Sequence, residues 1–215
     1  MNASSQRRRV ATKTNGRKEA RRQAIIEAAA QLFAELGYTA CEMDRVAAKL
    51  KVAKGTLYLY FKSKEELFCA CVDHAMLQMR AAVNKAAEIA VDPLDKIPAA
   101  IRAYLTFFDE HPQYVELLIQ ERANFRNRKR PSYFEHRDAN RGPWREMYRG
   151  LIDSGRVRSD LPVERLLDTI GNLLYGTMFT NYFIGRSASI DDQFHSLLEI
   201  VFRGILTQDE VRCRE

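Results

Sequence analysis

Residues 44–64 have the sequence DRVAAKLKVAKGTLYLYFKSK, and this stretch decides the fold of the chain. It predicts two short helices joined by a tight turn at Val52. Both helices have apolar residues at helical spacing that need cover: Val46, Ala47 and Leu50 on the first, Leu57 and Phe61 on the second. Two such helices, followed by basic and aromatic residues, indicate a helix-turn-helix.

The other side of the second helix has an unusual composition for a solvated surface. If Leu57 and Phe61 face inward, a glycine, a hydroxyl, a phenol and a leucine face outward. A helix that enters the major groove of DNA needs a small residue for close approach, hydroxyls for polar contacts and apolar groups for thymine methyls. The predicted DNA-contacting residues are Arg45, Lys54, Gly55, Thr56, Tyr58, Leu59, Tyr60 and Lys64.

Further elements surround the helix-turn-helix. They are the apolar positions Ile25, Ala28, Ala29, Leu32 and Phe33, the helix exit Gly37-Tyr38, the pair Val46-Ala47, the run 55–58, the pair Tyr60-Phe61 and the run 63–67. Their order and spacing, from Arg21 to about Ala81, resemble the DNA-binding domain of the TetR (tetracycline-repressor-like) family of bacterial transcriptional regulators. An ordinary helical hairpin is the alternative.

The resemblance implies an all-α fold of about nine helices, with an N-terminal three-helix DNA-binding domain and a C-terminal helical domain for ligand binding and dimerisation. We place a disordered basic arm at residues 1–20, the helix-turn-helix domain at 21–81 and the C-terminal domain at 82–215. Residues 1–64 contain 14 Lys or Arg against 5 Asp or Glu, a net charge of +9. The whole chain carries +6, which leaves −3 for the remainder. Such asymmetry is expected where one end meets a polyanion.

The arm contains Arg7-Arg8-Arg9, Lys13, Arg17 and Lys18 and almost nothing that could be buried, so we expect it to be disordered without DNA. It could lie in the minor groove or remain a solvated tail. It lacks the apolar stretch of a signal peptide. The four cysteines show no disulfide spacing, and together these features predict a cytoplasmic protein.

Three residues depart from the family pattern. Cys41 stands where Thr or Ser usually opens a helix, Lys51 replaces the turn glycine, and Ala53 replaces the serine that caps the second helix. A lost N-cap costs about 1 kcal/mol, and a left-handed non-glycine residue costs a similar amount, about 1 kcal/mol. Cys41 has two interpretations: a substitute cap, or a redox-sensitive thiol with a lowered pKa at a helix N-terminus.

Beyond Lys64 the pattern stays helical, with no strand alternation. The predicted helices run from Lys64 to about Ala90, from Asp92-Pro93 to His111, from Pro112 to the Arg-rich and Asn-rich segment 124–131, from there to Ser154 with an interruption or kink at Gly142-Pro143, from Val163 to about Ile184, and onward from a cap at Asp191 or Asp192.

The last two helices have apolar residues that a single chain of this size cannot easily cover. The first of them is too short and too interrupted by polar residues to span a membrane. In the family that the chain resembles, these helices pair with their copies, and a two-fold dimer also suits a pseudopalindromic operator. The predicted dimer contacts are Leu173, Phe194, Leu198 and Phe202.

The resemblance also implies a small-molecule cavity, and aromatic residues with isolated polar groups suit one. Its predicted lining is Tyr104, Phe108, Trp144, Tyr148, Asn172, Tyr175 and Phe179. Ordinary core packing is the alternative for each of them. Four arginines at 137, 141, 145 and 149 could bind an anion, or could form a solvated face paired with Asp138 and Glu146.

No catalytic constellation, metal-ligand spacing or phosphate-binding loop is present, so we expect no enzyme activity and no cofactor. The predicted function is a homodimeric, ligand-responsive regulator: a repressor released from operator DNA by a small hydrophobic or aromatic effector. A DNA-binding regulator without a small-molecule effector, protein-gated or architectural, is the alternative.

Overall fold

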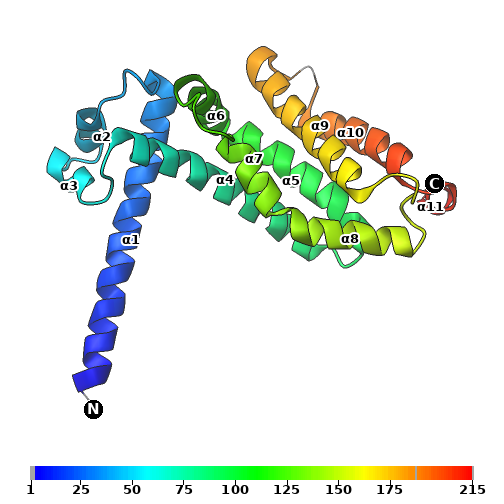
Figure 1. Cartoon of the computed structure of the whole chain (residues 1–215), viewed down its shortest axis with the longest axis horizontal. Helices are drawn as coiled ribbons and strands as arrows, with labels where there is room; N and C mark the ends of the chain where they lie inside the picture. The colour runs from blue at the N-terminus through cyan, green and yellow to red at the C-terminus, as the bar shows by residue number, and fades with distance from the viewer. Residues whose placement is uncertain (1–2, 187, 215) are drawn as a thin grey trace. The chain divides into compact units, whose positions relative to one another are not determined.

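The computed structural model describes residues 3–186 and 188–214, with side chains described from Gly16 onward. Within this part of the chain there are eleven α-helices, one 3-10 helix and no strand beyond an isolated bridge between Val157 and Leu206. The predicted all-α fold class is therefore confirmed (Figure 1).

The helices are α1 (Ala3–Leu36), α2 (Met43–Lys49), α3 (Lys54–Tyr58), α4 (Lys64–Ile89), η1 (Pro93–Asp95), α5 (Lys96–Glu110), α6 (Pro112–Asn124), α7 (Ser132–Ala139), α8 (Arg141–Asp153), α9 (Val163–Ile184), α10 (Ile190–Ile205) and α11 (Gln208–Arg214). The predicted starts at Lys64 and Pro112 and both ends of α9 are confirmed.

Two predicted boundaries are wrong. The helix before Ser154 breaks at Asn140, not at Gly142-Pro143, so that Pro143 lies in the first turn of α8. Proline is tolerated there because the backbone N–H groups of the first turn have no hydrogen-bond partner within the helix, so that the N–H that proline lacks is not needed. The cap of α10 is Ser189, whose hydroxyl accepts a hydrogen bond from the backbone N–H of Asp192 at 3.1 Å. Asp191 and Asp192 lie in the first turn instead, where negative charge favours the helix dipole.

Helix α1 begins at Ala3 and continues through most of the segment for which the sequence predicted disorder. That segment contains no proline and several Arg, Lys, Glu and Ala residues, all of which have high helix propensity. The side chains of Arg7, Arg8, Arg9 and Lys13 lie outside the described ones. Disorder of the arm in solution without DNA stays a prediction.

The chain forms two compact units. The first comprises the chain up to Ala75 together with Glu116–Arg128, and the second comprises Met76–Val115 and the chain from Lys129 onward. Helices α4 and α6 each contribute residues to both units. The segment 116–128, which the sequence analysis assigned to the C-terminal domain, therefore packs with the helix-turn-helix.

Contacts within the first unit explain why this segment belongs there. Gln120 Nε2 donates to the backbone carbonyl of Phe33 at 2.8 Å. Phe125 lies 4.9 Å from Tyr38 and 5.4 Å from Phe68, measured between ring centroids. Residues far apart in sequence thus share one core with α1 and α4.

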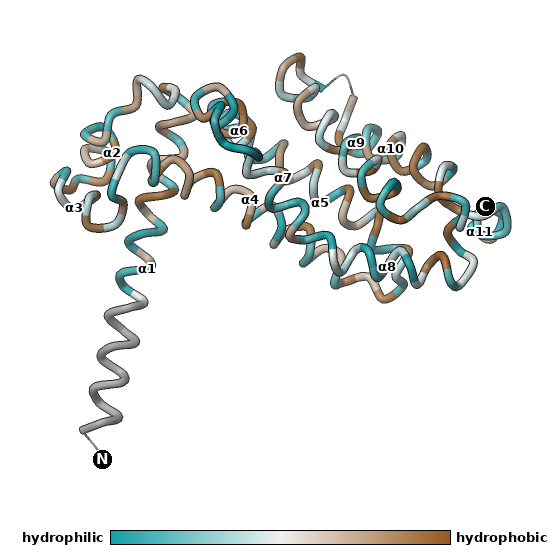
Figure 2. The backbone as a smooth tube through the Cα atoms, viewed as in Figure 1, coloured by the Kyte–Doolittle hydropathy of each residue, from teal (hydrophilic) through white to brown (hydrophobic). Residues whose placement is uncertain are grey.

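The second unit is built around α5, which contacts both α9 and α10. Its core includes Ile97, Ile101 and Leu105 of α5, Leu151 of α8, Leu166 of α9 and Phe194, Leu197, Val201 and Ile205 of α10. The α10 residues recur every three to four positions, so that one face of this helix is apolar (Figure 2).

Candidate functional site

The turn between α2 and α3 is closed by backbone hydrogen bonds. Lys51 N–H donates to the carbonyl of Ala48 and Val52 N–H to that of Ala47, each at 3.0 Å. Lys51 has a φ of 54°, and it is the one non-glycine residue with positive φ in the described part of the chain. This left-handed conformation costs about 1 kcal/mol. Ala53 is the N-cap of α3 and provides no side-chain hydrogen bond, as the sequence indicated.

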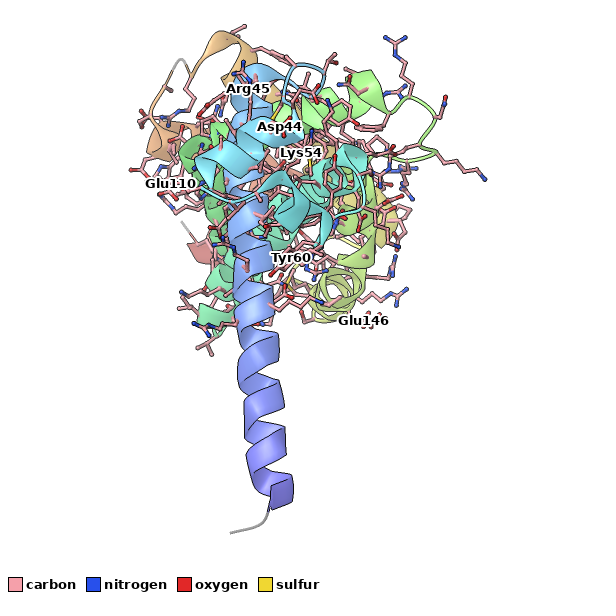
Figure 3. The ribbon with its side chains drawn as sticks, turned by 90° about the vertical axis from the view of Figure 1, so that its left-hand side faces the viewer. Asp44, Arg45, Lys54, Tyr60, Glu110 and Glu146 are labelled. Atoms are coloured by element: carbon pink, nitrogen blue, oxygen red, sulfur yellow. The ribbon has the colours of Figure 1, made fainter. Side chains whose placement is uncertain are left out.

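Helix α3 ends at Tyr58, earlier than predicted, and Leu59 and Phe61 follow it in a turn where Phe61 N–H donates to the carbonyl of Leu57 at 3.0 Å. The inward and outward residues of this segment are nevertheless those that the sequence predicted. Leu57 and Phe61 are fully buried, whereas 45% of Tyr58 and 78% of Leu59 is exposed. Gly55 is also exposed, with no heavy atom near the position of a Cβ. Figure 3 shows Arg45 of α2 and Lys54 of α3 on the viewer's side of these helices. The surface thus presents cations, a phenol, an aliphatic side chain and a site of close backbone approach.

Two of the predicted cations have protein partners. Lys54 Nζ lies 2.9 Å from the carboxylate of Asp44, which raises the pKa of this exposed lysine through their hydrogen bond. Lys64 Nζ donates to the backbone carbonyl of Thr39 at 3.2 Å and lies 4.9 Å from the ring centroid of Tyr38. Lys64 therefore fixes the connection between α1 and α2, a role that helical spacing alone could not reveal.

Both interpretations of Cys41 are wrong. The residue is fully buried, and the N-cap of α2 is Glu42. Burial raises the pKa of the Cys41 thiol, and this effect outweighs the nearby cations Lys64 and Arg45. A redox sensor needs an accessible thiol with a lowered pKa. Cys41 instead fills the apolar core as a small hydrophobic residue.

A cavity of about 160 Å³ lies in the second unit. Its lining consists of Met79, Arg80, Val83, Ile97, Ala100, Ile101, Tyr104, Tyr133, His136, Arg137, Asn140, Arg141, Trp144, Tyr148, Leu167, Ile170, Gly171 and Leu174. Of the seven predicted ligand contacts, Tyr104, Trp144 and Tyr148 line this cavity.

The other four predicted contacts lie elsewhere. Phe108 lines a second cavity, which it shares with Tyr104. Tyr175 packs against Tyr133 with 4.6 Å between ring centroids, and Phe179 packs against Tyr175 at 4.8 Å. Asn172 is exposed and accepts a hydrogen bond from Arg137 Nη1 at 3.1 Å. Aromatic composition therefore located the region, but could not separate lining residues from packing residues.

Two of the buried phenols in the cavity wall contact each other. The hydroxyls of Tyr104 and Tyr133 lie 2.9 Å apart and share a hydrogen bond. Burial raises the pKa of Tyr104 well above its usual value and raises the pKa of Tyr133 to about 12. Both groups therefore stay protonated at neutral pH. Tyr133 was absent from the predicted site because its neighbours in sequence give no sign of burial.

Three of the four arginines face α9. Arg137, Arg141 and Arg145 recur every four residues, opposite Asn172, Asp168 and Glu164, which also recur every four residues in the reverse order. We call these six residues the arginine ladder. The expected solvated face is wrong for Arg137 and Arg141, whose side chains are only 19% and 17% exposed. Their predicted partner Asp138 is nevertheless near both, at 3.4 Å from Arg137 and 3.7 Å from Arg141.

Arg149 differs from the ladder arginines. Its Nη1 lies 2.8 Å from Glu146, the partner that the sequence predicted, and both side chains are more than half exposed.

The outer surface of α9 and α10 is incompletely covered. Of the 22 residues of α9, only Leu166 and Met178 are buried. Leu173, Leu198 and Phe202 are partly buried against the core of the second unit. Phe194 is a correction to the predicted interface: it is 6% exposed and lies in the protomer's own core, with Arg102 stacked on its ring at 4.1 Å.

Among the described residues, no group of His, Cys, Asp and Glu side chains is arranged to hold a metal ion. No helix in this part of the chain is long and apolar enough to cross a membrane.

Comparisons with known proteins agree with this geometry. The family described as "Bacterial regulatory proteins, tetR family" matches residues 25–71, which contain α2 and α3. The transcriptional regulator YhgD of Bacillus subtilis is 35% identical over 103 residues, 48% of this chain and 53% of that protein. The chain therefore spans about half the length of that relative. The repressor KstR2 of Mycobacterium tuberculosis is 27% identical over 150 residues, 69% of this chain and 75% of that protein.

Solved structures share the fold. FadR of Bacillus subtilis, a transcriptional regulator in complex with stearoyl-CoA, superposes with a TM-score of 0.73 at 22% identity, covering 85% of this chain and 98% of that one. At this identity the likeness concerns the fold alone.

Proposed function

We propose, from the premise that this chain belongs to the TetR family of bacterial regulatory proteins, that it is a homodimeric repressor released from a pseudopalindromic operator by a small hydrophobic or aromatic effector. The observation that carries the proposal is the outward face of α3. It leaves a leucine and a tyrosine in solvent while two fully buried residues anchor the helix beneath them.

That face suits the major groove of DNA. Gly55 permits close approach, Thr56 and Tyr58 offer hydroxyls, and Leu59 offers an apolar contact for a thymine methyl. Arg45 and Lys54 supply positive charge for phosphates, which fix the register of the helix without reading the sequence. Asp44 holds Lys54 in place, and at the same time it lowers the net charge of this surface.

Two considerations support the proposed dimer: the requirements of DNA recognition and the surface of α9 and α10. One recognition helix reads too few base pairs for useful specificity, whereas a two-fold dimer reads two half-sites. The sparse burial of α9 leaves a surface for a second copy, and on α10 the side chain of Ile200 is 66% exposed.

Effector control requires a connection between the cavity and the DNA-binding surface. Helix α4 begins at Lys64 in the first unit and continues into the second, where Met79, Arg80 and Val83 line the cavity. An effector that binds the protein more tightly when α4 is in one position than in another would shift the equilibrium between a DNA-binding and a free state. The expected coupling is about 1–3 kcal/mol, and operator DNA must weaken effector binding by the same factor.

The proposal is tested first by selecting genomic fragments that the protein retains and measuring operator affinity against salt concentration. Lys54→Ala should weaken binding to all sequences and reduce the log-log salt slope by about 0.9 if one phosphate contact is lost. Leu59→Ala should instead change the preference among sites. Asp44→Asn is the matched control: removal of this carboxylate should strengthen binding. Absence of any retained fragment, with the protein folded, would refute the proposal.

A further inference from the structure

We infer that the effector is a compact monoanion, a single-ring aromatic carboxylate, whose carboxylate pairs with Arg80. The inference rests on the proposed function, because it takes the cavity of the second unit as the effector site. It adds the size, the charge and the anchoring residue of the ligand.

The size follows from the volume of the cavity. Its 160 Å³ is close to that of an engineered apolar cavity of about 150 Å³ that binds benzene. Sites for drug-sized ligands are larger, at roughly 300–1,000 Å³. Ile101, Trp144, Tyr148 and Leu174 provide apolar and aromatic walls on which one ring can pack. A single six-membered ring with a short substituent therefore fits.

The charge follows from the ionisable residues of the lining. Arg80, Arg137, Arg141 and His136 line the cavity, and no Asp or Glu is among its described lining residues. The buried Tyr104 and Tyr133 remain neutral. The wall thus carries positive charge without a carboxylate of its own, which favours an anionic ligand.

Carboxylates of the arginine ladder and of Asp138 already compensate two of these cations. Arg137 lies 3.4 Å from Asp138 and 3.8 Å from Asp168. Arg141 contacts Asp168 and lies 3.7 Å from Asp138 and 3.8 Å from Glu164. A ligand carboxylate at either arginine would have to compete with these carboxylates.

Arg80 is different. It is partly buried, lines the cavity from α4, and makes no hydrogen bond or ion pair with any residue that the structure describes. A guanidinium offers paired N–H donors in the geometry that a carboxylate accepts. A neutral ligand would leave Arg80 without a counter-charge, whereas a ligand carboxylate would supply one.

The experiment compares benzoate with benzamide, its neutral isostere, by quenching of Trp144. This residue is the only tryptophan of the chain and lies in the cavity wall, so a ligand bound in the cavity should change its emission. Benzoate should bind at least about tenfold more tightly than benzamide, because a hydrogen-bonded charge pair contributes more than a neutral one. Added salt should weaken benzoate binding and leave benzamide binding nearly unchanged.

Substitutions test whether the preference for benzoate over benzamide depends on Arg80. Arg80→Gln should bring the two affinities within about threefold, and Arg80→Lys should retain part of the preference because it retains the charge. Arg149→Gln is the matched control: this exposed arginine does not line the cavity, so the preference should persist. Circular dichroism confirms that each variant is folded.

Each outcome decides the inference. Equal binding of the two probes, or a preference that survives Arg80→Gln, would overturn the charge assignment. Failure of both probes to bind would overturn the size assignment. Neither result bears on operator binding or dimerisation, which are tested by separate measurements, because the quenching is measured without DNA.

Discussion

Helices α3 and α9 both expose apolar side chains, but they are supported very differently. Helix α3 has five residues, and the fully buried Leu57 and Phe61 hold it from below. Helix α9 has 22 residues, of which two are buried. A short helix that is anchored by buried residues can present exposed side chains to a partner that binds reversibly. A long apolar helix with sparse burial needs permanent cover, which a second copy of the chain would provide.

The largest expected effect comes from removing the support of α3. Phe61→Ala deletes a fully buried ring from the core of the first unit and should lower the free energy of unfolding by about 3–5 kcal/mol. Leu59→Ala is the control on the outward side of the same segment and should change it by less than about 0.5 kcal/mol. Urea denaturation followed by circular dichroism measures both. Equal effects would mean that α3 has no distinct inward and outward sides.

The next effect concerns the cover of α9 and α10. Ile200→Arg places a charge on a mostly exposed position, so that the protomer should fold normally. In a two-fold interface the same arginine would be buried twice, and dimerisation should weaken by several kcal/mol, about 3–5 for an uncompensated buried charge. Sedimentation at a series of concentrations measures the change. If the variant dimerised as tightly as the parent protein, Ile200 would lie outside the interface. A monomeric parent protein would contradict the proposed assembly.

A smaller effect is expected at the turn that sets the angle of α3. Lys51→Gly relieves the left-handed backbone strain and should raise the free energy of unfolding by up to about 1 kcal/mol. Lys49→Gly is the matched control, because Lys49 is within α2 and glycine there should cost about 1 kcal/mol. Thermal melting of the two variants should give shifts of opposite sign. Shifts of the same sign would exclude relief of strain as the explanation.

The smallest effect is a pH dependence in the second unit. Arg156 donates to Asp92 at 2.6 and 2.9 Å, and these hydrogen bonds lower the pKa of Asp92 to about 2. An unfolded aspartate titrates near ~3.9. Because the pKa of Asp92 is lower in the folded state than in the unfolded state, its ionised carboxylate stabilises the folded protein fully above about pH 4. This stabilisation is lost as the pH falls towards 2. Melting temperatures of the parent and of Asp92→Asn should therefore converge in this window.

Much of the fold, and the exposed and buried sides of the segment around α3, could be predicted because the deciding contacts are local. The helix starts at Lys64 and Pro112 follow from the chemistry of neighbouring residues, and the burial of Leu57 and Phe61 follows from their spacing. The left-handed turn at Lys51 was expected from the resemblance, because Lys51 stands where the family pattern has a glycine. Local errors arose where two capping residues competed, as at Ser189 and Asp191, and where Pro143 was taken to interrupt a helix whose first turn can hold it.

The cavity was predicted less well because its wall is assembled from distant segments. The resemblance led us to expect a ligand site, and aromatic composition pointed to Tyr104 and Trp144, which line the cavity. Composition also suggested Asn172 and Phe179, which do not line the cavity. Nothing near Arg80 in the sequence distinguishes it from a solvated arginine.

The sequence by itself therefore determined the helices, the turn and the outward face of α3, because each depends on residues a few positions apart and on helical geometry. Only the tertiary structure decided which charges are compensated. Arg141 meets Asp168 across 27 positions of sequence, whereas Arg80 meets no carboxylate in the described part of the chain. Electrostatic pairing depends on distance in space, and helical periodicity does not specify which faces of two helices meet.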